Sequence, residues 1–324
     1  MKILLTGGAG FIGSNVVDGY IEAGHEVVII DNLFTGRTEN INHATRFYLL
    51  DVRSEEVEKV FAIERPDIVN HHAAQMSVPA SVKDPFFDAD INIIGLLNLL
   101  ENSVRFWVKK FIFISTGGAV YGEKDNIPTP ETEAPEPLSP YAITKLSSEY
   151  YLKFYRNHYD LDYTVLRYAN IYGPRQVPHG EAGVVAIFMK QLRDSVVPKI
   201  YNYPEAPDGM TRDYCYVGDA AKANILALSS GQGETINIGT SLETTTGALY
   251  REILEIMRSH GLANDKKFDS PLRGAARPGD LRRSALDISK AAAVLGWSPE
   301  YDLKRGLQET IKHEILAPGN HEIK

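Results

Sequence analysis

Short runs of apolar residues alternate with amphipathic stretches along the first half of the chain. The apolar runs predict strands, and these lie at 2–6, 27–31, 46–49, 68–72, 111–115 and 163–168. The stretches between them have the spacing of one-sided helices, predicted at 14–23, 54–64, 84–104 and 141–158. Strands that are apolar throughout are typical of a sheet buried on both faces. The alternation therefore predicts an α/β fold, a doubly wound parallel sheet of the Rossmann type.

The second half of the chain is less regular. Gly and Pro cluster at 173–183 and 198–211, and a proline-rich segment at 122–140 predicts a loop over a surface or a site. Further helices are predicted at 217–230, 246–260, 287–295 and 302–316, with a strand at 235–239. We expect a Rossmann domain formed by 1–169, with about 217–239 added. We expect a smaller mixed domain, formed by 170–216 and 240–324, to close a cleft.

The first apolar run leads into the segment Thr6–Ser14, which contains glycines at 7, 10 and 13. In a strand–turn–helix unit, such glycines give a tight turn, a close approach to a pyrophosphate and close packing of helix on strand. The helix would direct its first N–H groups at the phosphates. The alternative is an ordinary turn that binds nothing, because glycine is common in turns.

Asp31 ends the second apolar run, 18 residues after Gly13. A carboxylate at about this spacing accepts hydrogen bonds from the hydroxyls of the adenosine ribose. It would repel the 2′-phosphate of NADP, and the next basic residue along the chain is Arg37. NAD is therefore the predicted cofactor.

The composition is that of a globular protein, with 44% hydrophobic and 23% charged residues among 324. A formal net charge of −8 disfavours nucleic acid and anionic membranes as partners. No apolar run approaches the roughly 18 residues of a membrane helix, and the N-terminal run is too short for a signal peptide. The single cysteine, Cys215, excludes an internal disulfide and fits a reducing compartment. We expect a cytoplasmic protein.

Two other features predict no separate site. His71 and His72 are adjacent, so on a strand they point to opposite faces, and no third metal ligand has suitable spacing. We therefore expect no metal. The tyrosine-rich stretch 150–163 has helical spacing in an acidic protein, so it predicts core or subunit contacts rather than nucleic-acid stacking.

Candidate acid–base chemistry lies where the fifth predicted strand ends and the helix 141–158 begins. Ser115 and Thr116 end the strand, and the carboxyl ends of parallel strands face the ligand cleft. A Ser-Pro pair suits a helix start, which places Tyr141 in the first turn and Lys145 on the same face one turn later. A nearby ammonium, the helix N-terminus and a nicotinamide cation would each lower the pKa of the phenol. Tyr141 is thus a candidate base, although the pair alone could equally be a solvated contact on a helix surface.

Taken together, these segments resemble the extended short-chain dehydrogenase/reductase family, and within it the nucleotide-sugar epimerases. The resemblance covers nearly the whole chain and includes Thr6–Gly13, Asp31–Leu33, Asp51–Val52, His71–Gln75, Tyr141, Lys145, Leu166–Asn170, Arg212–Tyr214, Arg277–Asp280 and Leu295–Trp297. It implies an NAD-dependent enzyme that interconverts UDP-glucose and UDP-galactose by oxidising C4 to a 4-keto sugar and reducing the opposite face. An epimerase specific for UDP-glucuronate or UDP-GlcNAc and a non-catalytic NAD-binding regulatory protein are the alternatives. The resemblance also implies a homodimer in which helices 88–104 and 141–158 form a four-helix bundle.

The resemblance further implies roles for individual residues. The implied catalytic residues are Tyr141, Lys145, Thr116 and Ser115. The implied cofactor-binding residues are Gly7, Gly10, Phe11, Ile12, Gly13, Asp31, Asn32, Leu33, Thr35, Gly36, Asp51, Val52, Ala73, Ala74, Gln75, Asn92, Tyr141, Lys145 and Tyr168. The implied substrate-binding residues are Thr116, Tyr141, Asn170, Val184, Val185, Tyr201, Arg212, Arg277, Asp280 and Ser284.

Two positions depart from the commonest epimerase pattern. Many epimerases carry Ser where this chain has Gly117, so Thr116 or Ser115 would supply the hydroxyl that polarises O4 of the sugar. The segment 117–119 also holds no carboxylate, whereas related dehydratases and decarboxylases carry one there. Ser284 aligns with a residue beside the C2 substituent that is often a bulky Tyr, so UDP-GlcNAc is expected to fit as well.

Overall fold

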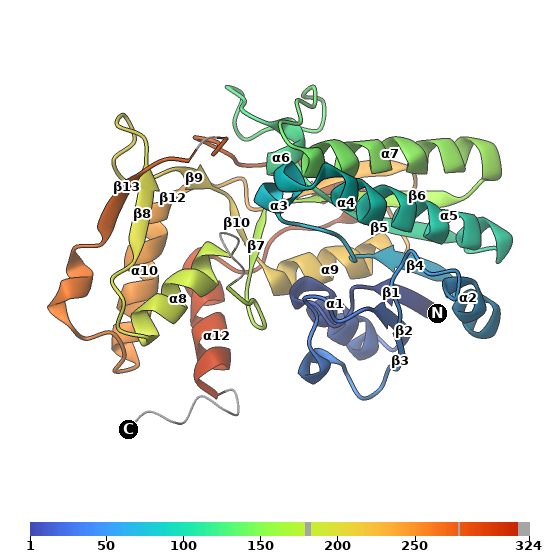
Figure 1. Ribbon diagram of the computed structural model, residues 1–324, viewed down its shortest axis with the longest axis horizontal. Helices are drawn as coiled ribbons and strands as arrows, with labels where there is room; N and C mark the ends of the chain where they lie inside the picture. The colour runs from blue at the N-terminus through green and yellow to red at the C-terminus, as the bar shows by residue number, and fades with distance from the viewer. Residues whose placement is uncertain (179–182, 278, 317–324) are drawn as a thin grey trace.

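The centre of the computed structural model, which describes residues 1–178, 183–277 and 279–316, is a parallel sheet of seven strands (Figure 1). Its strands are β1 (Lys2–Thr6), β2 (Glu26–Asp31), β3 (Arg46–Leu49), β4 (Ile68–His71), β5 (Lys110–Thr116), β6 (Asp162–Tyr168) and β11 (Glu234–Ile238). They lie in the order β11-β6-β5-β4-β1-β2-β3. The strand order reverses between β1 and β4, and ligands of doubly wound sheets bind at such a switch point. The predicted fold class and all seven predicted strands are confirmed.

Helices cover both faces of the sheet. On one face lie α1 (Phe11–Glu22), α9 (Val217–Ala227) and α11 (Ser289–Leu295), and on the other lie α2 (Val57–Glu64), α5 (Gly95–Arg105) and α7 (Pro140–Tyr159). Within β1, Ile3 and Leu5 pack into the first of these cores and Leu4 into the second. Successive side chains of a strand point to opposite faces, which explains why the three central residues of β1 are all apolar.

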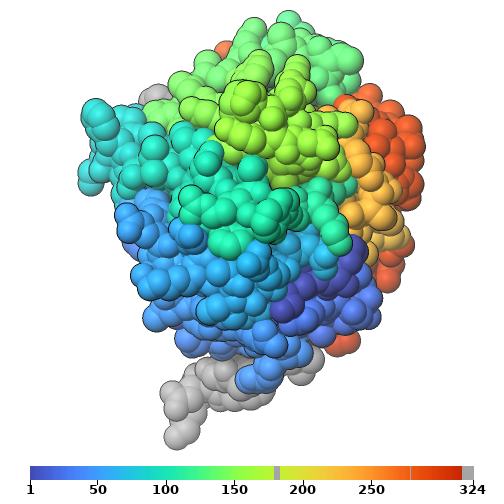
Figure 2. Space-filling view, turned by 90° about the vertical axis from the view of Figure 1, so that its right-hand side faces the viewer, coloured from blue at the N-terminus to red at the C-terminus, as the bar shows by residue number. Residues whose placement is uncertain are grey.

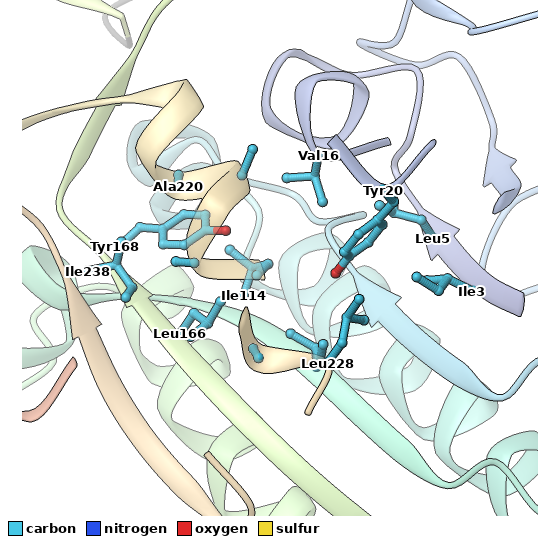
Figure 3. Packing of buried hydrophobic residues seen from close by; sticks show 14 of the residues in the cluster. Ile3, Leu5, Val16, Tyr20, Ile114, Leu166, Tyr168, Ala220, Leu228 and Ile238 are labelled. Carbon is cyan, nitrogen blue, oxygen red and sulfur yellow. The ribbon is translucent and has the colours of Figure 1, made fainter. Parts of the chain in front are cut away.

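A polar network runs through the first core, between α1, α9 and the sheet. Asn224 of α9 donates to the Tyr168 hydroxyl and accepts from Asn70 Nδ2 at 2.8 Å. Asn70 also donates to the Tyr20 hydroxyl at 2.7 Å. Figure 3 shows the hydroxyls of Tyr20 and Tyr168 pointing toward the centre of this apolar cluster. Buried polar groups are costly without partners, so Asn224 ties helix α9 to the sheet.

The predicted helix 84–104 is interrupted. The structure has α3 (Val78–Lys83), α4 (Pro85–Ala89), a π-helical turn (Asp90–Ile94) and then α5, and Asp84 caps α4 by accepting from Phe87 N at 3.0 Å. A further short helix, α6 (Gly117–Tyr121), follows β5 directly. π-Helical turns such as Asp90–Ile94 often occur at functional sites. Here the π turn carries Asn92.

The C-terminal half adds a third core beside the sheet. Short strands pair in twos: β7 (Asn170–Tyr172) with β10 (Tyr214–Tyr216), β8 (Lys199–Asn202) with β13 (Leu272–Ala275), and β9 (Thr211–Arg212) with β12 (Thr244–Thr245). The helices there are α8 (Val184–Arg193), α10 (Thr246–Ser259) and α12 (Leu303–Leu316). A 3-10 turn lies at Lys266–Asp269, and another lies in the first half of the chain at Thr38–Asn40. These three helices pack around Phe188, Tyr250 and Leu307 (Figure 1, left).

The segment 217–239 lies with the first half of the chain, because α9 packs on α1 and β11 pairs with β6. The division into two domains stays a prediction. Within the described residues, no helix is long and apolar enough to cross a membrane.

Candidate active site

The turn between β1 and α1 forms a cradle that requires glycine. Gly7 has φ +74°, and a Cβ placed there would lie 2.7 Å from the backbone N of Ala73. A Cβ on Gly13 would lie only 2.1 Å from the Gly7 carbonyl oxygen. Helix α1 begins at Phe11, and Gly10 at its N-cap has no side chain to satisfy the first N–H groups. The cradle fits a pyrophosphate, which those N–H groups and the helix dipole would bind.

Asp31 ends β2 beside this cradle. Its carboxylate accepts from Ala9 N at 3.0 Å and from Leu33 N at 2.8 Å. Burial raises the pKa of Asp31, and the two backbone hydrogen bonds oppose this rise. A Cβ on Gly36 would lie 2.9 Å from a carboxylate oxygen, so glycine there leaves the carboxylate room. Thr35 lies exposed on the same loop.

A second group on this side of the sheet surrounds Asp51. Its carboxylate accepts from Arg53 Nε at 2.8 Å and from Asn32 Nδ2 at 2.9 Å. The guanidinium holds the pKa of Asp51 well below its usual range and also pairs with Asp90 of the π turn. Val52 is buried next to Gly95. Sequence reasoning missed Arg53 and Asp90, which fix the predicted adenine-side residues.

The loop after β4 is tied to the helices that cover it. Thr6 Oγ1 accepts from Ala73 N at 3.3 Å, and the partly exposed Ala74 follows. Gln75 N donates to Asn92 Oδ1 at 2.9 Å, and Asn92 Nδ2 returns a hydrogen bond to the Gln75 carbonyl at 3.0 Å. The predicted residues Ala73, Ala74, Gln75 and Asn92 are therefore brought together. Beside them lies the buried Asp88, which the sequence reasoning missed.

Tyr141 and Lys145 both lie against the carboxyl end of β5. Burial and the charge of Asp88 raise the pKa of the Tyr141 phenol above its ordinary value, and interaction with the Thr116 side chain opposes this rise. Lys145 donates to the Ile114 carbonyl at 2.8 Å, and burial lowers its pKa to about 8. From the sequence we expected the ammonium to lower the phenol pKa. In this structure burial dominates, so the phenol is neutral.

Ser115 and Thr116 project from opposite faces of β5 and serve different purposes. The Ser115 hydroxyl donates to Glu149 at 2.6 Å, and Glu149 forms a buried ion pair with Arg167 at 2.6 Å. The Ser115 hydroxyl is therefore bound to a structural ion pair, and its catalytic role stays a prediction. Thr116 is the strand-end hydroxyl that contacts Tyr141.

The missing side chain at Gly117 has a packing reason. A Cβ there would lie 2.5 Å from Leu286 Cδ1 and 2.6 Å from Cδ2, and Leu286 is itself buried. At the next position, a Cβ on Gly118 would lie 3.1 Å from Ser284 Oγ. The segment around Ser284 therefore lies against α6.

Some predicted substrate residues gather on the C-terminal side of this site. Arg277 lies over the Tyr201 ring at 4.4 Å, and the Arg277 backbone N donates to Asp280 at 3.1 Å. Arg212 donates to the Leu281 carbonyl at 2.8 Å, which joins β9 to the same segment. Asn170 is exposed at the start of β7, and Val184 starts α8 partly exposed.

Two predicted residues lie in the cores instead. Val185 packs into the third core, and Tyr168 packs into the first core with its hydroxyl on Asn224. Neither side chain is exposed to the site, because 1% of Val185 and 5% of Tyr168 is accessible.

The chain is similar to known proteins over nearly its whole length. Residues 3–239 match the model of the NAD dependent epimerase/dehydratase family. The chain is 42% identical to a UDP-glucose 4-epimerase of Mycolicibacterium smegmatis, over 96% of this chain and 98% of the relative. A crystal structure of UDP-glucose 4-epimerase from Thermotoga maritima with UDP-glucose has 48% identity and TM-score 0.91, covering 97% and 99% of the two chains. One from Thermus thermophilus, a complex with NAD, has 43% identity and TM-score 0.89, covering 98% and 100%.

Proposed function

Because the chain belongs to the NAD dependent epimerase/dehydratase family, we propose that it is a UDP-glucose 4-epimerase, an isomerase that interconverts UDP-glucose and UDP-galactose. The observation that carries the proposal is the cluster of Tyr141, Thr116 and Lys145 at the carboxyl end of β5. This cluster lies at the same carboxyl edge of the sheet as the switch point between β1 and β4, where the glycine cradle and Asp31 fit a dinucleotide.

NAD supplies, when bound, the acceptor for hydride from C4 and the donor that returns it to the opposite face. Once ionised to the phenolate, Tyr141 would take the proton of the C4 hydroxyl, becoming a neutral phenol, and would give that proton back in the second step. The Thr116 side chain, which interacts with the phenol, would orient it. Burial raises the phenol pKa, so loss of the phenol's own proton depends on positive charge near the ring. Within the protein, the Lys145 ammonium would supply one such charge.

The two ligands would use different parts of the site. The N–H groups of Phe11, Ile12 and Gly13 would bind the cofactor pyrophosphate, and Asp31 would bind the adenosine ribose. The guanidinium groups of Arg212 and Arg277 would bind the pyrophosphate of the UDP-sugar, since their planar forks match its oxygens. The segment 117–119 contains no carboxylate, which favours epimerisation over dehydration.

We also propose that UDP-GlcNAc is a substrate. The proposal rests on the small side chain of Ser284, at a position where related epimerases often carry a bulky Tyr beside the C2 substituent. Specificity for UDP-GlcNAc or UDP-glucuronate is the alternative. A non-catalytic NAD-binding protein would lack turnover altogether.

A homodimer through α5 and α7 is a further part of the proposal. Their solvent side carries exposed apolar residues, Ile143, Tyr150 and Phe154 on α7 and Ile94 just before α5. Figure 2 shows α5 and α7 side by side on one face of the molecule, and the two helices are in contact. An exposed apolar face of this kind is typical of a subunit interface. The cytoplasm is the expected location, because Cys215 is a free, buried thiol.

The test is a turnover assay with the purified protein. UDP-glucose, UDP-galactose, UDP-GlcNAc and UDP-glucuronate are incubated separately, with and without added NAD, and the products are separated by chromatography. We expect UDP-glucose and UDP-galactose to interconvert, and the Tyr141→Phe variant to lose about 10²–10⁴-fold in kcat. Turnover of UDP-glucuronate alone, or full activity of Tyr141→Phe, would refute the proposal. Light scattering of wild type and Phe154→Glu tests the dimer, which the charge should dissociate.

A further inference from the structure

A buried carboxylate lies where α4, the π turn and α7 meet. Asp88 of α4 has 0% of its surface accessible. It accepts from Gln75 Nε2 at 2.7 Å, from Thr144 Oγ1 at 2.8 Å and from Asn92 Nδ2 at 3.2 Å. One carboxylate thus joins the loop after β4, the π turn and the first turns of α7.

Thr144 is the link between this carboxylate and the proton-transfer pair. It precedes Lys145 on α7 and lies one turn after Tyr141, whose carbonyl is 3.0 Å from Thr144 Oγ1. Residues spaced by three and four share one face of a helix, so Asp88 contacts α7 on the side that carries Tyr141 and Lys145. A shift of Asp88 would therefore displace both reacting groups.

The charge of Asp88 also acts on these groups. Its three donors are neutral, and the buried cation that interacts with its charge is Lys145. Burial lowers the pKa of Lys145, whereas the Asp88 and Glu149 carboxylates oppose this effect. His71 at the end of β4 and His72, the next residue, also lie near Lys145, and burial lowers the pKa of both imidazoles.

Glu149 already has its own cation, Arg167, with which it forms a bidentate ion pair. The negative charge of Asp88 and the positive charge of Lys145 therefore offset each other beside Tyr141.

We propose that Asp88 is a positioning residue for the proton-transfer pair: it anchors the catalytic turn of α7 to the loop 73–77 and balances the charge of the Lys145 ammonium. The proposal rests on the epimerase function, since it concerns the same Tyr141 and Lys145. Its two parts, charge and anchoring, are separated by two substitutions.

The charge is tested with Asp88→Asn, which keeps the shape of the side chain. NMR of the lysine side chains, with the Lys145 signal assigned by Lys145→Met, measures the titration of Lys145 without cofactor or substrate. We expect the Lys145 midpoint to move to lower pH in Asp88→Asn, and the kcat profile of the loaded enzyme to move in the same direction. Glu58→Gln removes an exposed carboxylate of α2 and should leave the midpoint unchanged. An unchanged midpoint in Asp88→Asn would overturn the charge balance, even if the enzyme proves to act on another sugar.

The anchoring is tested with Thr144→Val, which keeps the Asp88 charge and the side-chain shape. We expect kcat to fall by about tenfold or more with KM and the pH profile little changed, because misplacing reacting groups slows the chemical step. This variant also serves if Asp88→Asn does not fold. Wild-type kcat in Thr144→Val would overturn the anchoring role.

Discussion

The substitution Gly117→Ser, which introduces the residue that many epimerases carry there, should destabilise this protein. A Cβ at Gly117 would lie 2.5 and 2.6 Å from the two methyl carbons of Leu286, closer than real Cβ contacts come. Leu286 has little freedom to move away. Its side chain is 1% accessible, its N donates to Asp213 at 3.2 Å, and its carbonyl accepts from Ser241 at 2.9 Å.

Two opposing effects determine the size of the change. Replacing glycine by serine in helix α6 gains about 0.5 kcal/mol of helix propensity. Overpacking a buried site costs about 1–3 kcal/mol, because neighbours must leave their preferred rotamers. The net destabilisation is therefore about 0.5–2.5 kcal/mol. The new hydroxyl should not increase kcat, since Thr116 already contacts the phenol.

Urea unfolding of Gly117→Ser and three further variants measures this effect. Gly118→Ser is the matched control in the same helix, because a Cβ there meets only Ser284 Oγ, at 3.1 Å, and the side-chain oxygen can rotate. Leu286→Ala removes the clashing methyl groups, so the double variant Gly117→Ser/Leu286→Ala should be more stable than the sum of the single changes implies. Equal stability of Gly117→Ser and wild type, or strict additivity in the double variant, would show that Leu286 does not exclude a side chain at 117.

Three further predictions concern the base, the cofactor and the core. Thr116→Val should lower kcat by tenfold or more, whereas a near-wild-type rate in a steady-state assay would remove this hydroxyl from the mechanism. Asp31→Ala should weaken NAD binding by about 10–100-fold in calorimetry, because hydrogen bonds to a charged group contribute about 1.5–3 kcal/mol, and unchanged affinity would contradict a ribose contact. Asn224→Leu should reduce the free energy of unfolding by about 2–4 kcal/mol, since Asn70 and the Tyr168 hydroxyl lose their buried partner; a loss below about 0.5 kcal/mol in urea unfolding would contradict this.

Features that depend only on residues close together in the chain were predictable from the amino-acid sequence alone. The strands β1 to β6 were predicted because each is a short apolar run, and the Thr6–Ser14 turn because glycine spacing follows from backbone sterics. The helix start before Tyr141 was predicted by local capping, and Ser139 accepts from Ala142 N at 3.2 Å as expected. Two-residue strands such as β9 were not predicted, because they are too short to have a period.

Tertiary packing was needed to establish which chemical groups meet. Ser115 contacts Glu149, 34 residues away, and Gly117 faces Leu286, which is farther still along the chain. The packing of helices on β5 therefore decides that the Ser115 and Thr116 hydroxyls have different contacts. The raised pKa of Tyr141 has the same origin, because burial and the charge of Asp88 arise from packing between segments. A local pattern specifies which residues form an element, but desolvation and long-range contacts set how their groups ionise and what they touch.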